Sequence, residues 1–289
     1  MSAEVWTIAR VVKWATDDFR TRGIESPRLE AELLLGAVLG LDRIKLITES
    51  MRPLAPAELT SFKELITRRR RNEPTAYLLG KREFYGRMFA VGPGVLIPRP
   101  DTEALVETAL GRTADRSMSG RALDLCTGSG CVAITFARER PTWQVTGTDL
   151  SPDALAIAQQ NALRLGAIWN MRWLGGDLFA PLGEAERVFD LITANPPYIP
   201  AAEVETLAPT VRDFEPRLAL DGGPDGLVLM RRLVAEAPRH LAPGGVLAVE
   251  IMAGTSDDVR ALFAGAGLVD LEVARDYGGH DRVVSGRLG

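Results

Sequence analysis

The chain has 289 residues, of which 46% are hydrophobic and 25% are charged, and its net charge is −4. This composition is ordinary for a soluble globular protein and unlike that of a disordered or fibrous chain. The length exceeds that of a usual single domain, so we expect one domain of roughly 200 residues and a smaller unit. Only two cysteines are present, Cys126 and Cys131, and both histidines lie far from them, so the sequence predicts no metal site and no disulfide framework.

The charge is divided unevenly along the chain. Residues 1–90 hold 16 Lys and Arg against 12 Asp and Glu, whereas residues 91–289 hold 18 against 26. Nucleic-acid affinity depends on neutralising phosphates with Lys and Arg, so the acidic back part argues against a large duplex-binding face. Up to Phe19, charges such as Lys13 and Asp17 interrupt the apolar residues, unlike in a signal peptide or a membrane span. We therefore expect a cytoplasmic protein that does not enter a membrane.

The first 75 residues predict a small helical domain. Gly23 is suited to a left-handed helix stop, and Ser26 followed by Pro27 predicts the next helix start, with serine as the cap and proline at the first helical position. Arg68 to Arg71 end the last stripe, and arginines at a helix end are more often solvated than part of a binding patch. Apolar residues recur at helical spacing in three stripes: Val5, Ile8, Val12, Ala15 and Phe19; Leu29, Leu33, Leu34, Ala37 and Val38; and Leu59, Phe62, Leu65 and Ile66.

Residues 76–98 predict a β-hairpin connector, because their apolar period changes and Gly86, Gly92 and Gly94 punctuate it. Residues 99–289 then alternate short apolar strands with helical stretches, which is typical of a doubly wound, Rossmann-like parallel sheet. The fold class is therefore α/β with a helical domain in front. The expected strands are residues 123–126, 145–148, 171–174, 191–194 and 246–251, with two further strands at 268–274 and 282–285.

A glycine-containing loop follows the first expected strand and reads Asp124-Leu125-Cys126-Thr127-Gly128-Ser129-Gly130. Glycines at this turn let the backbone approach a nucleotide closely. Asp149 lies 19 positions after Gly130 at the end of the next strand, where its carboxylate can accept hydrogen bonds from both ribose hydroxyls. Asp177 follows the third strand and is suited to the amine of adenine, with Leu178 and Phe179 as apolar walls. Together these residues favour an adenosine-containing cofactor.

The same loop also fits a dinucleotide fingerprint, since Gly128-x-Gly130-x-x-Ala133 is followed by Asp149. Asp124, directly before the loop, favours the other interpretation. Its carboxylate is suited to the amino group of a methionine moiety and would repel a pyrophosphate. A dehydrogenase is therefore the weaker prediction, and neither histidine lies in a motif that serves nicotinamide chemistry.

The tetrapeptide Asn195-Pro196-Pro197-Tyr198 lies at the C-terminal end of the fourth expected strand, the edge at which open α/β sheets bind ligands. Adjacent prolines fix φ and remove two N–H donors, so the backbone carbonyls and the Asn195 amide oxygen can accept hydrogen bonds from a substrate NH2 group. Tyr198 is predicted to cover the flat face of that group. The tetrapeptide is also compatible with a plain proline-rich turn.

The sequence resembles the HemK/PrmC family, the N5-glutamine methyltransferases of peptide chain release factors, over nearly all of residues 74–289. Four positions depart from the family pattern: Cys126 replaces a usual glycine, Ala76 replaces a common glutamine, and Met252 and Thr255 stand where glycine and glutamine are expected. The motifs that carry the resemblance are Pro74-x-x-Tyr77-x-x-Gly80, Phe84-Tyr85-Gly86, Val95 to Glu103, Thr127 to Gly130, Asn195 to Tyr198, Phe214-Glu215-Pro216 and Asp221-Gly222-Gly223-x-Asp225-Gly226.

The resemblance implies a class I methyltransferase that transfers a methyl group from S-adenosyl-L-methionine to the glutamine side-chain nitrogen of the Gly-Gly-Gln motif in class I release factors. The implied catalytic residues are Asn195, Pro196 and Tyr198, which also bind substrate with Pro197. Arg99 and Glu103 either line the substrate channel or brace the connector, unless they form a salt-bridged helix start. The implied cofactor-binding residues are Asp124, Cys126, Thr127, Gly128, Ser129, Gly130, Asp149, Asp177, Leu178 and Asn195.

Positioning is the main chemical requirement of this reaction, because an amide lone pair is delocalised whereas a sulfonium methyl group is already electrophilic. No general base is needed before transfer, and the proton can leave afterwards to water. The implied partner is the release factor, docked across both domains of a monomer. Two alternatives stay open: a methyltransferase for exocyclic amino groups of nucleic acids, which present the same planar geometry, and a non-catalytic factor that binds S-adenosylmethionine.

Overall fold

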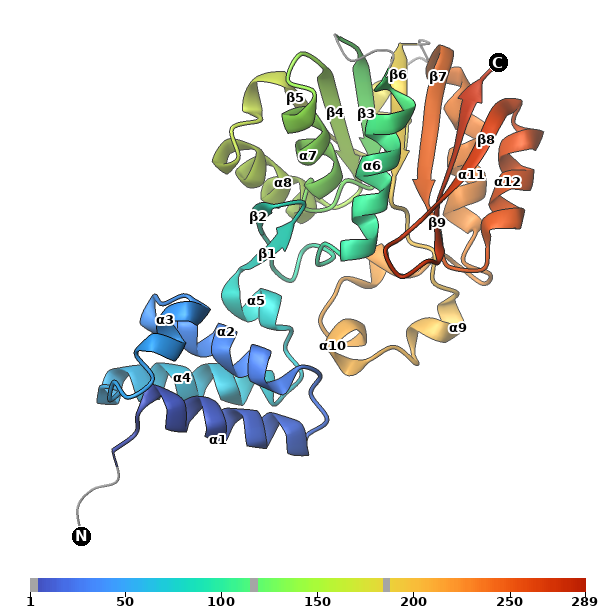
Figure 1. Cartoon of the computed structure of the whole chain (residues 1–289). Helices are drawn as coiled ribbons and strands as arrows, with labels where there is room; N and C mark the ends of the chain where they lie inside the picture. Colours follow the sequence, from blue (N-terminus) through green and yellow to red (C-terminus); the bar gives the residue numbers. More distant parts are fainter. Residues whose placement is uncertain (1–4, 115–118, 184–187) are drawn as a thin grey trace. The chain divides into compact units, whose positions relative to one another are not determined.

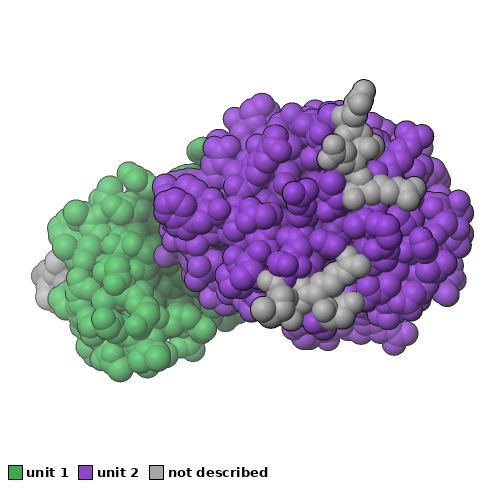
Figure 2. Space-filling model, turned by 90° about the horizontal axis from the view of Figure 1, so that it is seen from above, with its two compact units in different colours: residues 1–80, 209–214 green, residues 81–208, 215–289 purple. Residues whose placement is uncertain are grey.

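The computed structural model describes residues 5–114, 119–183 and 188–289 and divides into two compact units, which Figure 2 colours separately. Unit 1 comprises Met1–Gly80 and Pro209–Phe214, and unit 2 comprises Lys81–Ala208 and Glu215–Gly289. The two strands of the hairpin therefore fall in unit 2. No helix within the described ranges is long and apolar enough to cross a membrane.

Unit 1 is built from short helices around an apolar core (Figure 1). Three predicted stripes form α1, α2 and α4, although Val5 and Leu29 are exposed. Gly23 has φ +69° and Pro27 is the first residue of α2, as predicted. Ser26 occupies the N-cap position of α2 as predicted, but it has a left-handed φ of 46° and its side chain makes no capping hydrogen bond. The helices are α1 (Ile8–Thr21), α2 (Pro27–Leu39), α3 (Arg43–Thr48), α4 (Pro56–Arg69), α5 (Thr75–Leu79) and α10 (Pro209–Arg212).

Two of the four arginines at the end of α4 are internal ties of unit 1, which corrects the interpretation as a solvated terminus for these two, whereas Arg68 and Arg71 are exposed as that interpretation expects. Arg69 is buried, and its Nε donates to Glu30 of α2 at 2.8 Å. Arg70 donates through two nitrogens to Asp18 of α1, at 2.9 and 2.7 Å. Bidentate pairing of this kind adds geometric specificity to the charge attraction, so these side chains help to fix α1 and α2 against α4.

Unit 2 holds a seven-stranded mixed sheet in the order β5-β4-β3-β6-β7-β9-β8. The strands β5, β4, β3, β6 and β7 run parallel, whereas β9 is antiparallel to both of its neighbours. All seven predicted strands are present, and β9 inserts between β7 and β8 rather than extending the parallel part. They are β3 (Arg121–Leu125), β4 (Gln144–Asp149), β5 (Met171–Gly175), β6 (Phe189–Ala194), β7 (Leu241–Glu250), β8 (Leu268–Arg275) and β9 (Asp281–Leu288), and the separate hairpin is β1 (Lys81–Phe84) with β2 (Arg87–Ala90).

Helices cover both faces of this sheet (Figure 1). On one face, α6 (Glu103–Arg112), α7 (Cys131–Glu139) and α8 (Pro152–Arg164) share a core with Ala122 of β3 and with the hairpin. On the other face, α11 (Val228–Glu236) and α12 (Ser256–Gly265) pack on Leu123 and Leu125 of the same strand. Successive residues of a strand point to opposite faces, so the apolar run of β3 contributes side chains to both cores.

The strand order places two loops side by side. β3 pairs with β4 on one side and with β6 on the other, so chain connections leave β3 and β6 in opposite directions. Open α/β sheets bind ligands at such a switch point, outside the carboxyl ends of the strands. The glycine loop after β3 and the Asn195 tetrapeptide after β6 both begin at this edge.

Candidate active site

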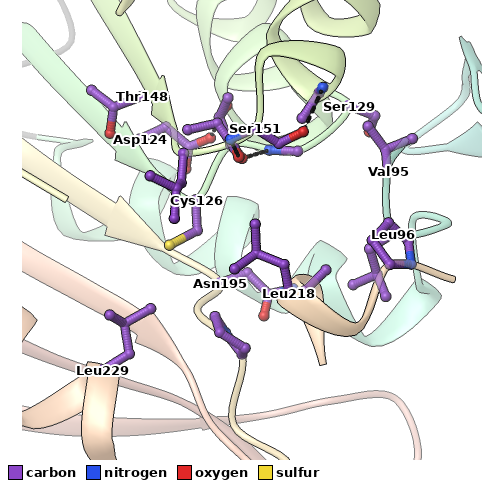
Figure 3. A pocket seen from close by; sticks show the side chains of 18 of the residues that line it. Val95, Leu96, Asp124, Cys126, Ser129, Thr148, Ser151, Asn195, Leu218 and Leu229 are labelled. Carbon is purple, nitrogen blue, oxygen red and sulfur yellow. Dashed lines mark hydrogen bonds between the residues drawn. The ribbon is translucent and has the colours of Figure 1, made fainter. Parts of the chain in front are cut away.

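A cavity with a volume of about 430 Å³ opens at this edge of unit 2. Its lining combines the loops after β3, β4, β5 and β6 with the segment from Gly94 to Thr102 and the loop from Pro216 to Gly223. Figure 3 shows Val95 and Leu96 across the cavity from Asp124 and Cys126. The volume suits a small-molecule ligand, since the pockets that bind such ligands typically have volumes of about 300–1,000 Å³.

Asp124 is a buried carboxylate at the end of β3, with an exposed fraction of 3%. Its Oδ2 accepts from the Thr127 hydroxyl at 2.6 Å, and its Oδ1 accepts from the Thr193 hydroxyl at 2.7 Å. Burial raises the pKa of Asp124 to about 6, and the two hydroxyls offset part of that rise. Among the residues that the structure describes, no cationic side chain forms an ion pair with this carboxylate, so the site favours a ligand that supplies a positive charge.

The glycine loop is anchored on Asp149 at the end of β4. Asp149 Oδ2 accepts from the Gly128 amide at 2.8 Å, and Oδ1 accepts from the Ser151 amide at 2.9 Å. Burial raises the pKa of Asp149 above its usual value, against the effect of these amides. Each carboxylate oxygen can accept more than one hydrogen bond, so Asp149 is able to hold the loop and to accept from ligand hydroxyls at the same time.

Two residues of the cavity adopt a backbone conformation that normally requires glycine. Cys126 has φ +55° and Leu178 has φ +48°. The left-handed region costs a residue with a Cβ roughly 1–2 kcal/mol, which explains why a glycine is expected at the position that Cys126 occupies. Burial raises the pKa of the Cys126 thiol above its usual range, so this side chain stays neutral.

Asn195 follows β6 and faces the cavity, where Figure 3 shows it below Cys126. Its Nδ2 donates to the hydroxyl of Thr102 at 3.3 Å. Thr102 is buried and ends the 3₁₀ turn η1 (Pro100–Thr102) that precedes α6. Because the NH2 group is directed to Thr102, the amide oxygen of Asn195 is left as the acceptor for a ligand.

Tyr198 lies on a second buried carboxylate rather than on the cavity lining. Its hydroxyl donates to Glu250 Oε1 at 3.0 Å. Glu250 is the last residue of β7 and is 1% exposed. Burial raises the pKa of Glu250 to about 7, and hydrogen bonding to Thr102 and Tyr198 offsets part of the rise.

The loop from Asp221 to Gly226 packs against the backbone of the tetrapeptide. Ile199 donates its amide to Leu220 at 3.0 Å, and the Gly222 amide donates back to Ile199 at 2.8 Å. A Cβ on Gly222 would lie 2.8 Å from the Pro197 oxygen and 2.8 Å from Tyr198 Cα. Only glycine permits this approach, so the loop holds Pro197 and Tyr198 from behind.

Glu215 lies directly before the loop from Pro216 to Gly223 and connects it to the segment from Gly94 to Thr102. It is 5% exposed, and its Oε2 accepts from the Ile97 amide at 2.9 Å. Its Oε1 accepts from Arg99 Nη2 at 2.5 Å. Arg99 therefore forms a salt bridge at the start of the helix, as one of the alternative interpretations expects, and its partner is Glu215. Glu103 instead accepts from the Tyr85 amide at 2.9 Å and braces the hairpin.

Two family models match the chain: one described as the PrmC N-terminal domain, over residues 10–80, and one described as a methyltransferase domain, over residues 122–214. A release factor glutamine methyltransferase from Geobacter sulfurreducens is 47% identical and is aligned over 99% of this chain and 98% of its own. One from Bordetella pertussis is 46% identical over 91% of this chain and 95% of its own. The chain belongs to the release factor glutamine methyltransferase family.

The solved structure of a methyltransferase from Pyrococcus furiosus is 20% identical, covers 71% of this chain and 91% of its own, and has a TM-score of 0.52. At that identity it supports the methyltransferase fold alone. The predicted fold class and family are confirmed, and S-adenosyl-L-methionine is the cofactor of this methyltransferase. The cavity fits it chemically, because Asp124 offers an unmatched negative charge and Asp149 offers acceptors at the strand end.

Most residues predicted for the site of this release factor glutamine methyltransferase line the one cavity. Gly130, Pro196, Tyr198 and Glu103 are not part of its described lining. Gly130 instead is the N-cap residue directly before α7, with φ +78°. Asp177 does line the cavity and pairs with Arg232 at 2.7 Å, so its contact with adenine stays a prediction. The predicted residues in the lining are Arg99, Asp124, Cys126, Thr127, Gly128, Ser129, Asp149, Asp177, Leu178, Asn195 and Pro197.

Sequence reasoning missed the residues that hold the site residues in place. Thr102, Thr193 and Glu250 act through contacts that no local motif reveals. Asn161 of α8 is fully buried, accepts from and donates to the Ala90 backbone, and also donates to the Ser129 carbonyl at 2.9 Å. A signal was available for Asn161, because a polar residue on the apolar face of a helix requires a partner.

Proposed function

We propose that this enzyme methylates the glutamine side-chain nitrogen of the Gly-Gly-Gln motif in class I peptide chain release factors, with Asn195 as the main acceptor of the substrate amide. Two observations support the proposal. The chain aligns almost end to end with relatives named for this activity. The Asn195 NH2 group is engaged by Thr102, which leaves the amide oxygen for a substrate N–H.

The chain's own residues supply position rather than acid–base chemistry. When bound, S-adenosyl-L-methionine supplies an electrophilic methyl group. Asn195 Oδ1 and the Pro196 carbonyl each accept one N–H of the substrate amide, which raises electron density on its nitrogen and turns the lone pair towards the methyl group. Positioning of this kind is able to lower a barrier by about 7–11 kcal/mol. Tyr198 packs beside the amide plane in this proposal, held by Glu250.

The cofactor is proposed to lie along the strand ends. Asp124 takes the amino group of the methionine moiety, because its buried carboxylate gains a cationic partner there. Asp149 takes the ribose hydroxyls, and Asp177 with Leu178 takes the adenine. Gly128 and Ser129 complete the floor of the cavity. A pyrophosphate is disfavoured by the same carboxylate at Asp124, which argues against a dinucleotide.

We also propose that the enzyme works in the cytoplasm as a monomer and takes no nucleic-acid substrate. The excess of acidic residues in 91–289 supports the last point, since phosphate neutralisation requires Lys and Arg. The relatives are named for the methylation of release factors, which are proteins and not nucleic acids. Light scattering of the purified protein tests the monomer, and a second mass at twice the chain mass would contradict it.

Transfer of radiolabelled methyl from S-adenosyl-L-methionine tests the proposed reaction. Three acceptors are compared: a purified class I release factor, the same factor with the glutamine of Gly-Gly-Gln replaced by alanine, and a nucleic-acid sample. The expected result is label on the factor that has its glutamine, and no label on the alanine variant or on the nucleic acid. Label on nucleic acid alone would support an amino-methyltransferase of bases, and cofactor binding without label on any acceptor would support a non-catalytic role.

A further inference from the structure

We infer that Asn161 is a positioning residue for the cofactor, because its side-chain amide joins the glycine loop to the hairpin strand β2 and so fixes two walls of the cavity relative to each other. The inference rests on the proposed placement of the cofactor along the strand ends. It extends that site to a residue of α8 that is not itself part of the cavity lining.

The Asn161 side chain is hydrogen-bonded to the backbone of two separate segments. Its Oδ1 accepts from the Ala90 amide at 2.7 Å, and its Nδ2 donates to the Ala90 carbonyl at 3.0 Å. The same Nδ2 donates to the Ser129 carbonyl at 2.9 Å. An amide NH2 group has two protons, so both are engaged. Turning the amide over would place its NH2 against the Ala90 N–H and its oxygen against two carbonyls, so only one orientation satisfies all three contacts.

The two bonds to Ala90 close one edge of the hairpin. Lys81 of β1 lies opposite Ala90, but the Ala90 N–H and C=O both bond to Asn161. A residue of an adjacent antiparallel strand exchanges two bonds in the same way, so the Asn161 amide takes the place of a third strand. Asn161 is fully buried, and backbone groups that lose their partner in the interior are costly.

The chain after β2 continues along the same face of α8 to the cavity. Asp153, Ile157 and Asn161 are spaced four residues apart, so they lie on one face of the helix. A Cβ on Gly94 would lie 3.0 Å from Asp153 Cβ and 3.6 Å from Ile157 Cδ1. Gly94 begins the segment that forms one wall of the cavity, and Ser129 belongs to the glycine loop that forms another (Figure 3). One face of α8 therefore carries the first wall, and Asn161 ties the second wall to it.

This tie should act on cofactor affinity rather than on the chemical step. A site whose walls are already ordered binds more tightly, because no binding free energy is used to order them. Without the Asn161 amide, the glycine loop and the Gly94 segment would have to be ordered when the cofactor binds. Turnover of the loaded enzyme should change little, because Asn195 is held by Thr102 and not by this contact.

Calorimetric titration of the whole chain with S-adenosyl-L-methionine tests the inference. Asn161→Ala should weaken the cofactor Kd about tenfold, the size of effect expected for one buried hydrogen bond. The kcat at saturating cofactor should stay within about threefold of the wild-type value.

Asn170→Ala is the matched control. Asn170 ends the 3₁₀ turn η3 (Ile168–Asn170), and its Nδ2 also donates to three backbone carbonyls, which lie between α7 and the start of β4 and outside the described lining. This variant should lower the Tm as Asn161→Ala does, and its cofactor Kd should stay within about threefold of the wild-type value. Equal weakening of the Kd in both variants would mean that Asn161 acts through stability alone, which would overturn the inference.

Ala90→Pro keeps the inference falsifiable if Asn161→Ala folds poorly. Proline removes the N–H that Asn161 accepts and leaves the Asn161 side chain itself unchanged. The Kd should weaken as in Asn161→Ala, and the double variant should bind within about threefold of that single variant, because both changes cut the same tie. Met88→Pro is the control, since it places the same ring on the same edge of β2 at an exposed residue and keeps the Ala90 donor.

Wild-type affinity in both Asn161→Ala and Ala90→Pro would overturn the inference, and so would a double variant whose loss equals the product of the single losses. Unchanged affinity in Asp124→Asn as well would overturn the proposed placement of the cofactor itself. The Kd is measured without a release factor, so these outcomes do not bear on the proposed substrate. A wild-type enzyme that binds the cofactor but labels no release factor would overturn the proposed function and leave the role of Asn161 standing.

Discussion

The two sides of the cavity are held in place by contacts of different sequence range. On the cofactor side, Asp124 is held by Thr127 three residues away and by Thr193 across 69 residues, and Asp149 by Ser151 two residues away and by Gly128 across 21. On the acceptor side, Asn195 is held by Thr102 across 93 residues, and Tyr198 by Glu250 across 52. The cofactor side therefore combines local contacts with long-range ones, whereas these acceptor-side contacts all depend on the folded sheet.

The chemistry of the two sides differs as well. The cofactor side presents carboxylates to its ligand, and charge therefore contributes to binding. The acceptor side presents a neutral amide, and its carboxylate, Glu250, stands behind it. Changes on the first side should alter cofactor affinity, and changes on the second should alter turnover at constant affinity. The predictions below test that division.

Asn195→Ala should have the largest effect. It removes an acceptor that is proposed to act on the reacting nitrogen, and loss of one such preorganised group costs about 10²–10³ in kcat. The cofactor Kd should change by less than about threefold, because no carboxylate is lost. Single-turnover methylation and calorimetry measure the two quantities. The exposed amide of Gln159 on α8 provides the control as Gln159→Ala, and equal kcat in both variants would contradict the assignment of Asn195.

Gly222→Ala should come next. Its Cβ would lie within 2.8 Å of the backbone of Pro197 and Tyr198, so the tetrapeptide must shift. A misplacement of about 1 Å costs a reaction about 100-fold, and we expect kcat to fall by that order while the cofactor still binds.

Gly111→Ala is the matched control for this change. Gly111 lies in α6, and a Cβ there meets no atom within 4 Å. The control should retain full turnover and gain up to about 1 kcal/mol of stability from helix propensity. Wild-type kcat in Gly222→Ala would show that the loop does not hold the acceptor backbone.

The sequence predicted the fold and the sheet edge at which the cavity opens for a physical reason. Strand ends such as Asp124 and Asp149 are marked by an apolar run followed by a polar residue, and parallel strands bring those ends to one edge. The glycine loop is contiguous in the chain, so its residues could be placed together without knowing the topology.

The acceptor side could be predicted only in part. Asn195 was marked by its prolines, but nothing near Thr102 or Glu250 in the sequence indicates that they hold Asn195 and Tyr198. The positions of Thr102 and Glu250 depend on β7 lying beside β6 and on the turn before α6. The insertion of β9 as an antiparallel strand also lacks a local signal, because period-2 patterns do not encode strand direction.

Asp124→Asn tests the cofactor side. A hydrogen bond to a charged group contributes about 1.5–3 kcal/mol, so we expect cofactor affinity at pH 8 to weaken by about 10–100-fold with a smaller effect on saturated kcat. The pKa of Asp124 is raised to about 6, and a cationic ligand needs its ionised form. Wild-type affinity should therefore fall about tenfold per unit below pH 6. The variant should lack this pH dependence, and a parallel decline in both proteins would exclude Asp124 as the titrating group.

Cys126→Gly should have the smallest effect, and it concerns backbone strain rather than a ligand contact. Cys126 holds φ +55°, which glycine adopts without the penalty of a Cβ. Glycine also loses the packing of the thiol on the apolar core, so Cys126→Ala is needed as the partner variant, since it loses the sulfur and keeps the strain.

Because glycine relieves the strain, the free energy of unfolding should be about 1 kcal/mol higher for Cys126→Gly than for Cys126→Ala. This corresponds to a Tm that is about 2–4 °C higher for a domain of this size. Cofactor affinity should follow the same order, because the strained residue lines the cavity. A higher Tm for Cys126→Ala than for Cys126→Gly would mean that the left-handed turn is not strained. The cofactor loop would then tolerate a side chain at this position without cost, and Cys126 would be a neutral departure from the family pattern.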